Sequence, residues 1–178
     1  DNLVFKNREN IVVMNINCGN VIIELLPEVS PNAVARFKNM IVNKEYDDVA
    51  FHRVVENFLV QAGDLEFGKK GNIDYGKIGT GKSGLGTIES EVDKDFNYTK
   101  GSVGLARSLK YDTEDSQFFI MLGDSAHLDN QYTVWGKVVS GMEYVDQIKK
   151  GDSSQNGTVT DPDKIITMQV AADVDESK

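Results

Sequence analysis

The sequence predicts a single, mainly β domain, and three observations support this. About eight short runs of apolar and β-branched residues are separated by segments rich in glycine, asparagine and aspartate. Only two segments have helical spacing, and they do not alternate with the strands as β-α-β units would. With 178 residues, 40% of them hydrophobic, the chain can bury roughly 70% of its unfolded surface in one core. An antiparallel barrel or sandwich is therefore favoured over a parallel sheet.

The predicted elements follow in chain order. Two β-rich runs, residues 11–17 and 20–26, are joined by a tight turn that contains glycine. A helix follows, with Ser30 as N-cap and Pro31 at the first helical position. Further strands are predicted at residues 49–55, 58–63, 102–107, 116–122, 132–139 and 164–172, and a second helix at residues 142–150.

Composition excludes several classes of function. The 28 acidic and 19 basic residues give a net charge of −9, which repels phosphate backbones, so no nucleic-acid partner is expected. No apolar run reaches the roughly 18 residues of a membrane span. The single cysteine, Cys18, excludes an internal disulfide and is expected to be a buried, inert thiol. His52 and His127 lack the spacing of a ligand set, so neither a metal nor another cofactor is expected.

Residues 76–84, "GKIGTGKSG", match the phosphate-binding pattern G-x-x-x-x-G-K-[ST]. Such a loop works only when a buried strand precedes it and a helix N-terminus follows, because the backbone N–H groups must be aimed at the phosphate. Here the preceding segment is polar and interrupted by glycines, and Gly84 and Gly86 would break a following helix. The sequence therefore argues against a nucleotide site.

The densest chemical signal is "AFHRVVENFLVQAGD", residues 50–64. If it forms two strands about a short turn, period-two alternation places Phe51, Arg53 and Val55 on one face, and Leu59 and Gln61 on a common face of the next strand. Arginine among apolar strand residues is the informative feature. By composition alone it could equally be an edge residue whose charged group reaches water.

The segment "FHRVVENFLVQAGD" closely resembles the signature of the cyclophilins, a family of prolyl isomerases. The later blocks "GSVGLAR", "SQFFIML" and "LDNQYTVWGKVVSGMEYVDQI" resemble other blocks of that family in the same order. The resemblance implies a closed eight-stranded antiparallel β-barrel capped by two α-helices. It also implies a domain at residues 11–172, with an N-terminal extension at residues 1–10 and an acidic tail at residues 173–178.

The same resemblance assigns the site. Arg53 corresponds to the catalytic arginine, and Gln61 and Phe58 join it in the catalytic group. The residues implied to bind the peptide are Leu59, Ala106, Arg107, Gln117, Phe119, His127, Leu128 and Tyr132. The glycine-rich loop falls where the family has a loop bordering the pocket for residues that precede the proline, so Lys77, Thr80 and Lys82 are predicted to form a secondary rim of the groove.

The implied function is cis-trans isomerisation of X-Pro peptide bonds in client proteins, as an aid to folding, with no covalent intermediate and no metal. A non-catalytic chaperone or scaffold that captures proline-containing segments in the same groove is the alternative. His127 stands where animal members often have tryptophan, so cyclosporin binding is expected to be weak. A monomer is expected.

Tyr132, the Ala106–Arg107 pair and the insertion "DLEFGKKG" are more similar to bacterial members. Many of those are exported, and Asp1 in place of a start methionine is compatible with a cleaved signal. A periplasmic or otherwise exported location is therefore predicted, with a cytoplasmic one as the alternative.

Overall fold

The structure is a computed structural model that describes residues 7–174 of the 178-residue chain. The predicted extension, residues 1–10, and the predicted acidic tail, residues 173–178, lie partly outside the described residues. Within the described range, no helix has the length and apolar character needed to cross a membrane.

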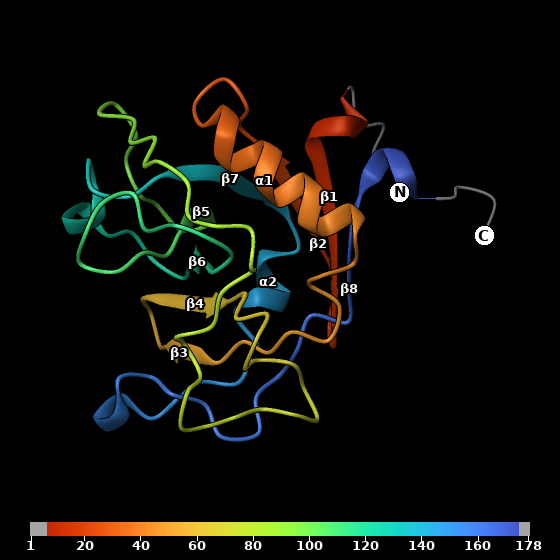
Figure 1. Cartoon of the computed structure of the whole chain (residues 1–178), viewed down its shortest axis with the longest axis vertical. Coiled ribbons are helices and arrows are strands. Elements are labelled where there is room, and N and C mark those ends of the chain that lie inside the picture. The colour runs from red at the N-terminus through yellow and green to blue at the C-terminus, as the bar shows by residue number, and fades with distance from the viewer. Residues whose placement is uncertain (1–6, 175–178) are drawn as a thin grey trace.

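Eight antiparallel strands form one curled sheet in the order β3-β4-β6-β5-β7-β2-β1-β8 (Figure 1). The strands are β1 (Ile11–Ile16), β2 (Gly19–Leu25), β3 (Arg53–Val55), β4 (Leu59–Ala62), β5 (Ser102–Leu105), β6 (Phe118–Met121), β7 (Val134–Ser140) and β8 (Thr167–Val170). The helices are α1 (Pro31–Val42) and α2 (Met142–Val145), with single 3₁₀ turns at Arg8–Asn10, Ala126–Leu128, Ser153–Gln155 and Ala171–Asp173.

The prediction of a closed barrel is wrong, because the sheet is open and β3 and β8 are its two edges. Instead of a ladder, a few backbone hydrogen bonds connect the segments that precede these strands. Phe51 N donates to Asp163 O at 2.9 Å, and Ile165 N donates to Val49 O at 2.9 Å. Asp48 at φ 67° and Asp161 at φ 51° have left-handed backbone just before these two segments, so the chain turns there.

Other boundaries also differ from prediction. The second helix ends at Val145 instead of residue 150, because the chain turns there with i→i+3 bonds and buries Ile148 in the core. Phe51 lies before β3 and packs in the core, so it does not share the face of Arg53. Cys18 lies in the turn between β1 and β2 and is exposed, not buried.

Helix α1 lies across the sheet (Figure 1). Its apolar face packs there, and the Phe37 ring stacks on Trp135 of β7 with centroids 4.3 Å apart. Ser30 occupies the predicted N-cap position, but its hydroxyl donates to Val134 O at 2.7 Å and caps no helix N–H. The Glu91 carboxylate takes that role, since it accepts from the backbone N–H groups of Asn32 and Ala33. Two backbone N–H groups at the start of α1, which have no partner within the helix, are therefore hydrogen-bonded by a residue distant in sequence.

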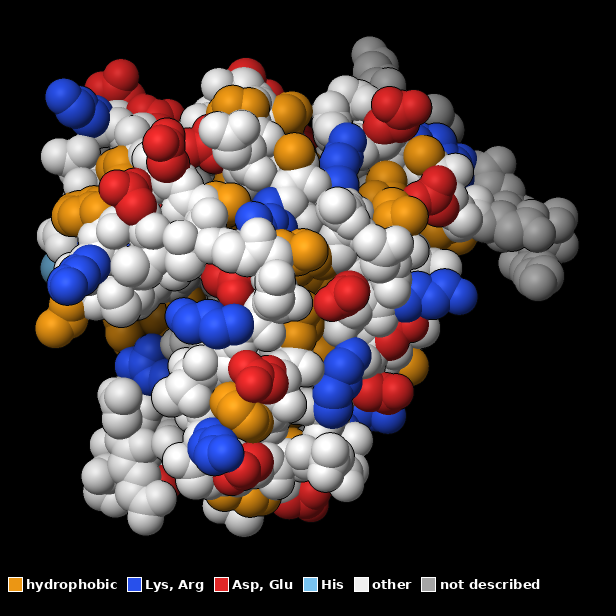
Figure 2. All heavy atoms as spheres, in the orientation of Figure 1, with side chains coloured by type: hydrophobic (Ala, Val, Ile, Leu, Met, Phe, Trp, Pro, Cys, Tyr) orange, Lys and Arg blue, Asp and Glu red, His pale blue; other side chains and the backbone are white. Residues whose placement is uncertain are grey.

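The two faces of the sheet carry two separate apolar clusters. Along β6, Phe118 points into the large core with Phe37 and Trp135, whereas Phe119 belongs to a smaller apolar cluster on the opposite face. Leu59 also lies in this second cluster, which adjoins the site described below. On the molecular face seen in Figure 2, basic and acidic side chains are interspersed among apolar ones.

Candidate active site

Four residues lie in one row across neighbouring strands. Arg53 on β3 pairs with Gln61 on β4, Gln61 pairs with Phe119 on β6, and Phe119 pairs with Gly104 on β5. Residues directly opposite each other in a sheet present their side chains on the same face. The pairing register therefore brings an arginine and an amide of one hairpin together with an aromatic ring from a distant part of the chain.

This row borders a pocket of about 330 Å³. Its lining residues are Arg53, Phe58, Leu59, Gln61, Ala106, Arg107, Phe119, His127, Leu128, Gln131 and Tyr132. The sequence predicted all of these except Gln131. Gln117, the remaining residue predicted to bind the peptide, lines a neighbouring pocket.

The Arg53 side chain is held in place by neutral partners. Its Nε donates to Asn156 O at 2.8 Å, Nη2 donates to Asn156 Oδ1 at 3.2 Å, and Nη1 donates to Gln61 Oε1 at 3.2 Å. Partial burial lowers the pKa of Arg53, an effect that the nearby Tyr132 opposes. An arginine nevertheless stays protonated at neutral pH. These three bonds use three of the five guanidinium N–H groups, which leaves two donors for a ligand.

The walls of the pocket are aromatic. Phe119 is 4% exposed and lies beneath the pocket, and the Tyr132 ring meets it edge-on at 5.7 Å and 90°. Tyr98 supports both, since its ring lies 5.9 Å from Phe119 and its hydroxyl donates to Tyr132 O at 2.8 Å. Burial raises the pKa of Tyr98, so this hydroxyl remains a donor. Phe58, Leu59, Phe119 and Leu128 thus form an apolar recess within the pocket.

His127 lies beside this recess on the 3₁₀ turn Ala126–Leu128. Its ring is 5.5 Å from that of Phe58, and its Nδ1 lies 2.7 Å from Ser125 Oγ.

A second pocket of about 320 Å³ shares Gln61, Ala106 and Arg107 with the first. A chain of amides connects the two pockets. Gln61 Nε2 donates to Gln117 Oε1 at 3.0 Å, and Gln117 Nε2 donates to Gly79 O at 2.9 Å. Because Gln61 Oε1 accepts from Arg53, the orientation of both amides follows from the bonds that they make.

Two of the three residues predicted to form the secondary rim line this second pocket. Thr80 and Lys82 are among its lining residues, together with Ser108, Thr113 and Asp115. Lys77 lines neither pocket, and its ammonium lies 5.4 Å from the centroid of the Phe67 ring. This is the geometry of a cation–π contact.

Comparison with known proteins identifies the family. The family model described as cyclophilin type peptidyl-prolyl cis-trans isomerase/CLD matches residues 11–170. The chain belongs to this family.

Curated relatives agree with this assignment. The chain is 45% identical over 167 residues to a protein of Brucella suis named probable peptidyl-prolyl cis-trans isomerase, covering 93% of this chain and 84% of the relative. It is 33% identical over 168 residues to a peptidyl-prolyl cis-trans isomerase of Acinetobacter baylyi, covering 89% of this chain and 84% of the relative. The activity of this cyclophilin is therefore the isomerisation of peptidyl-prolyl bonds.

Solved structures show the same fold. A cyclophilin from Hirschia baltica superposes with a TM-score of 0.77 at 21% identity, covering 95% of this chain and 76% of that one. A cyclophilin type isomerase of Cryptosporidium parvum, crystallised in the presence of the dipeptide Ala-Pro, gives a TM-score of 0.76 at 22% identity, covering 90% and 98%.

The glycine-rich loop of this cyclophilin does bind anions, but they are its own carboxylates. Asp64 Oδ2 accepts from the backbone N–H of Gly79 at 2.7 Å and of Gly81 at 3.0 Å. Glu66 Oε2 accepts from Lys82 N at 3.1 Å, and Asp115 Oδ2 accepts from the next N–H along the loop, that of Ser83, at 2.8 Å. The donors that a nucleotide phosphate would need are already bonded.

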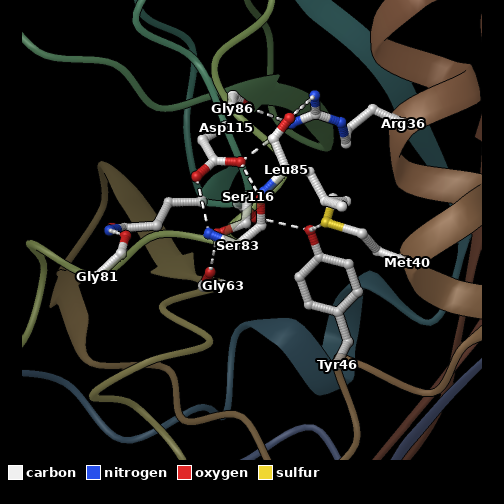
Figure 3. A network of polar contacts seen from close by, with 11 residues as sticks. Arg36, Met40, Tyr46, Gly63, Gly81, Ser83, Leu85, Gly86, Asp115 and Ser116 are labelled. Carbon is white, nitrogen blue, oxygen red and sulfur yellow. Dashed lines mark hydrogen bonds and ion pairs between the residues drawn. The ribbon is translucent and has the colours of Figure 1, made fainter.

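Asp115 also connects this loop to α1. Arg36 extends from α1 and donates from Nη1 to Asp115 Oδ1 at 3.0 Å and to Gly86 O at 2.7 Å (Figure 3). The Ser83 hydroxyl donates to the same Asp115 oxygen at 2.5 Å. Both side chains of the ion pair are largely buried, at 13% exposed for Arg36 and 6% for Asp115. These bonds connect the rim of the second pocket to α1.

Several functional residues were missed by the sequence reasoning. Asn156 contacts the predicted Arg53 from a distant position, and its local signal is the "NG" dipeptide at residues 156–157, typical of a turn. Asp64 and Asp115 accept from backbone N–H groups of the glycine-rich loop, which brings together residues that are distant in the chain. No group of three or more His, Cys, Asp or Glu side chains suited to a metal ion occurs within residues 7–174.

Proposed function

We propose that Arg53 is the catalytic residue of this isomerase and that the proline ring occupies the recess above Phe119. The observation that carries the proposal is the row Arg53–Gln61–Phe119, which places a fixed guanidinium beside an apolar recess on one face of the sheet. Two guanidinium N–H groups without a partner among the described residues are available to a substrate.

The chemistry requires a donor and no covalent step. An X-Pro amide resists rotation by roughly 18 to 20 kcal/mol because the nitrogen lone pair is shared with the carbonyl group. At the twisted transition state that lone pair is localised on a pyramidal nitrogen. An N–H of Arg53 directed at this nitrogen stabilises the twisted state more than either planar state, which is the condition for catalysis.

The other residues hold the two sides of the bond. Phe58, Leu59, Phe119 and Leu128 supply apolar contact for the proline ring and exclude water. Gln61 donates one amide hydrogen to Gln117, so its second amide hydrogen is available for the substrate carbonyl. The peptide lies along Ala106 and Arg107, which line both pockets.

The residues that precede the proline are proposed to occupy the second pocket, against Gln117, Thr80 and Lys82. The shared lining of the two pockets supports a continuous groove in this direction. Lys77 is not part of this proposal, because it lines neither of the two pockets.

The proposal is tested with Arg53→Ala and Arg53→Lys. Isomerisation of an X-Pro peptide, measured by NMR exchange, should fall at least about tenfold in Arg53→Ala, equivalent to about 1.4 kcal/mol of transition-state stabilisation. Arg53→Lys keeps the charge without the planar set of donors and should retain part of the rate. The far-UV circular dichroism should not change. A rate close to wild type in folded Arg53→Ala would refute the assignment.

The same NMR experiment separates catalysis from capture. A scaffold would broaden the peptide resonances by binding without accelerating exchange between the cis and trans signals. The assistance of protein folding, an exported location, a monomeric state and weak cyclosporin binding remain predictions.

A further inference from the structure

Arg107 is the second arginine of the groove, and its guanidinium contacts two tyrosine rings. Its guanidinium carbon lies 4.1 Å from the centroid of Tyr111 and 4.5 Å from that of Tyr132. Nη1 donates to Ser108 O at 3.0 Å and Nη2 donates to Gln131 O at 2.7 Å. Two cation–π contacts and two hydrogen bonds restrict a side chain that is otherwise flexible.

The charge of Arg107 is not neutralised by these contacts. Both of its hydrogen-bond acceptors are backbone carbonyl groups, and Nε is buried with no partner among the described residues. None of the ion pairs between residues 7 and 174 includes Arg107. A full positive charge therefore remains in the groove.

Arg107 is the cation that lines both pockets, because Arg53 lines only the first pocket. Lys82 lines only the second pocket, and its backbone N–H donates to the Glu66 carboxylate. Asp115, the acidic residue among those that line the second pocket, is paired with Arg36. The whole chain carries a net charge of −9, so a positive groove is a local departure from the charge of the protein.

We infer that Arg107 determines substrate specificity and selects X-Pro peptides that carry a carboxylate side chain on a residue just before the proline. Arg107 lines both pockets, so the segment that connects the proline to the second pocket passes beside it. A carboxylate there is attracted to a cation whose position is already restricted, whereas a lysine is repelled. This inference rests on the proposed function.

The test uses peptides that differ only in Glu, Gln or Lys at each of the three positions preceding the proline. For each enzyme variant, kcat/KM for the Glu and Lys peptides is divided by its own value for the Gln peptide, so a general loss of activity cancels. Wild type should favour Glu over Lys by roughly fivefold or more at one of these positions. The preference should shrink in 1 M NaCl, where the Debye length is about 3 Å.

Three variants assign the preference to a residue. Arg107→Gln should reduce the Glu-to-Lys ratio to within about twofold, and Arg107→Lys should restore part of it. Lys137→Gln is the matched control, because it removes one positive charge from an exposed position on β7 that lines neither pocket. It should leave the wild-type ratio unchanged.

Failure of this inference is distinguishable from failure of the proposed function. If wild type isomerises all the peptides with a Glu-to-Lys ratio within twofold, or if the ratio survives in Arg107→Gln, Arg107 does not set the specificity. If Lys82→Gln alone abolishes the ratio, the selecting cation is Lys82 and the inference is likewise overturned. If no peptide is isomerised, the proposed function itself is wrong.

Discussion

Asn156 holds Arg53 at two atoms, with its backbone oxygen 2.8 Å from Nε and its side-chain Oδ1 3.2 Å from Nη2. The two residues are 103 positions apart in the chain. Asn156 has a left-handed backbone, φ 58°, which asparagine tolerates better than most residues. Asn156 is therefore a positioning residue for the guanidinium.

Asn156→Gly should lower kcat about fivefold with little change in KM, since it removes one hydrogen bond worth about 1 kcal/mol while permitting the same backbone conformation. Steady-state kinetics on an X-Pro peptide measures this. Gln155→Ala, an exposed change in the same turn, is the control and should have wild-type kinetics. Equal kcat values in Asn156→Gly and wild type would show that the side-chain bond does not position Arg53.

The Phe119 ring occupies the space that a side chain at position 104 would fill, so this position is glycine. A Cβ at Gly104 would lie 2.4 Å from Phe119 Cζ, well inside any normal contact. Gly104→Ala should therefore destabilise the protein by about 1 to 3 kcal/mol and raise KM, because Phe119 must move into the recess. Urea unfolding and kinetics measure the two effects.

The double variant Gly104→Ala/Phe119→Leu identifies the cause. A smaller side chain at 119 relieves the overlap, so the double variant should lose less stability than the sum of the two single variants. Strictly additive losses would mean that the cost of Gly104→Ala arises elsewhere.

The site could be predicted from sequence where its geometry is local. Arg53, Phe58, Leu59 and Gln61 lie in one hairpin, so period-two alternation and a short turn place Arg53 opposite Gln61. Phe119 and Tyr132 came from the family resemblance, because no local pattern specifies which strands pair.

Other features depended on contacts that a linear pattern does not encode. The sheet is open because only a few hydrogen bonds, and no strand ladder, connect the segments before β3 and β8, and the short second helix follows from the burial of Ile148. The role of Asn156 depends on a turn that packs against β3 only in the folded chain. Such long-range partners are determined by tertiary packing and not by spacing.

His52 should make the protein less stable in mild acid. Burial lowers the pKa of His52 from 6.5 to about 4, although the nearby Asp64 opposes the shift. The folded state thus favours the neutral ring, so this stabilisation is complete above pH 6.5 and is lost as the pH falls toward 4. Between pH 7.5 and pH 5 the loss should be about 2 kcal/mol.

Urea unfolding of wild type and His52→Gln at the two pH values measures this contribution. Most carboxylates titrate below pH 5 and contribute little in this window. The variant should therefore show a weaker dependence on pH than wild type by about 2 kcal/mol. The same dependence in both proteins would exclude His52 as its source.

Asp64 should determine the shape of the glycine-rich loop. Its carboxylate is fully buried and accepts four backbone N–H groups, those of Glu66, Phe67, Gly79 and Gly81. Asp64→Asn replaces one acceptor oxygen by an NH₂ group that faces donors, which should cost about 3 kcal/mol in urea unfolding. Because the loop lines the second pocket, KM should rise more for long peptides than for short ones.

Four hydrogen bonds from the glycine-rich loop to carboxylates predict how wild type responds to a nucleotide. Millimolar magnesium-ATP should leave its melting temperature unchanged, since a ligand raises Tm only by binding the folded state, and the loop N–H groups are occupied by Asp64, Glu66 and Asp115. A rise in Tm with magnesium-ATP, absent with magnesium chloride alone, would contradict this. Asp64→Asn provides a second test. If its loop binds inorganic phosphate, the Asp64 carboxylate is the group that prevents phosphate from binding to this loop in wild type.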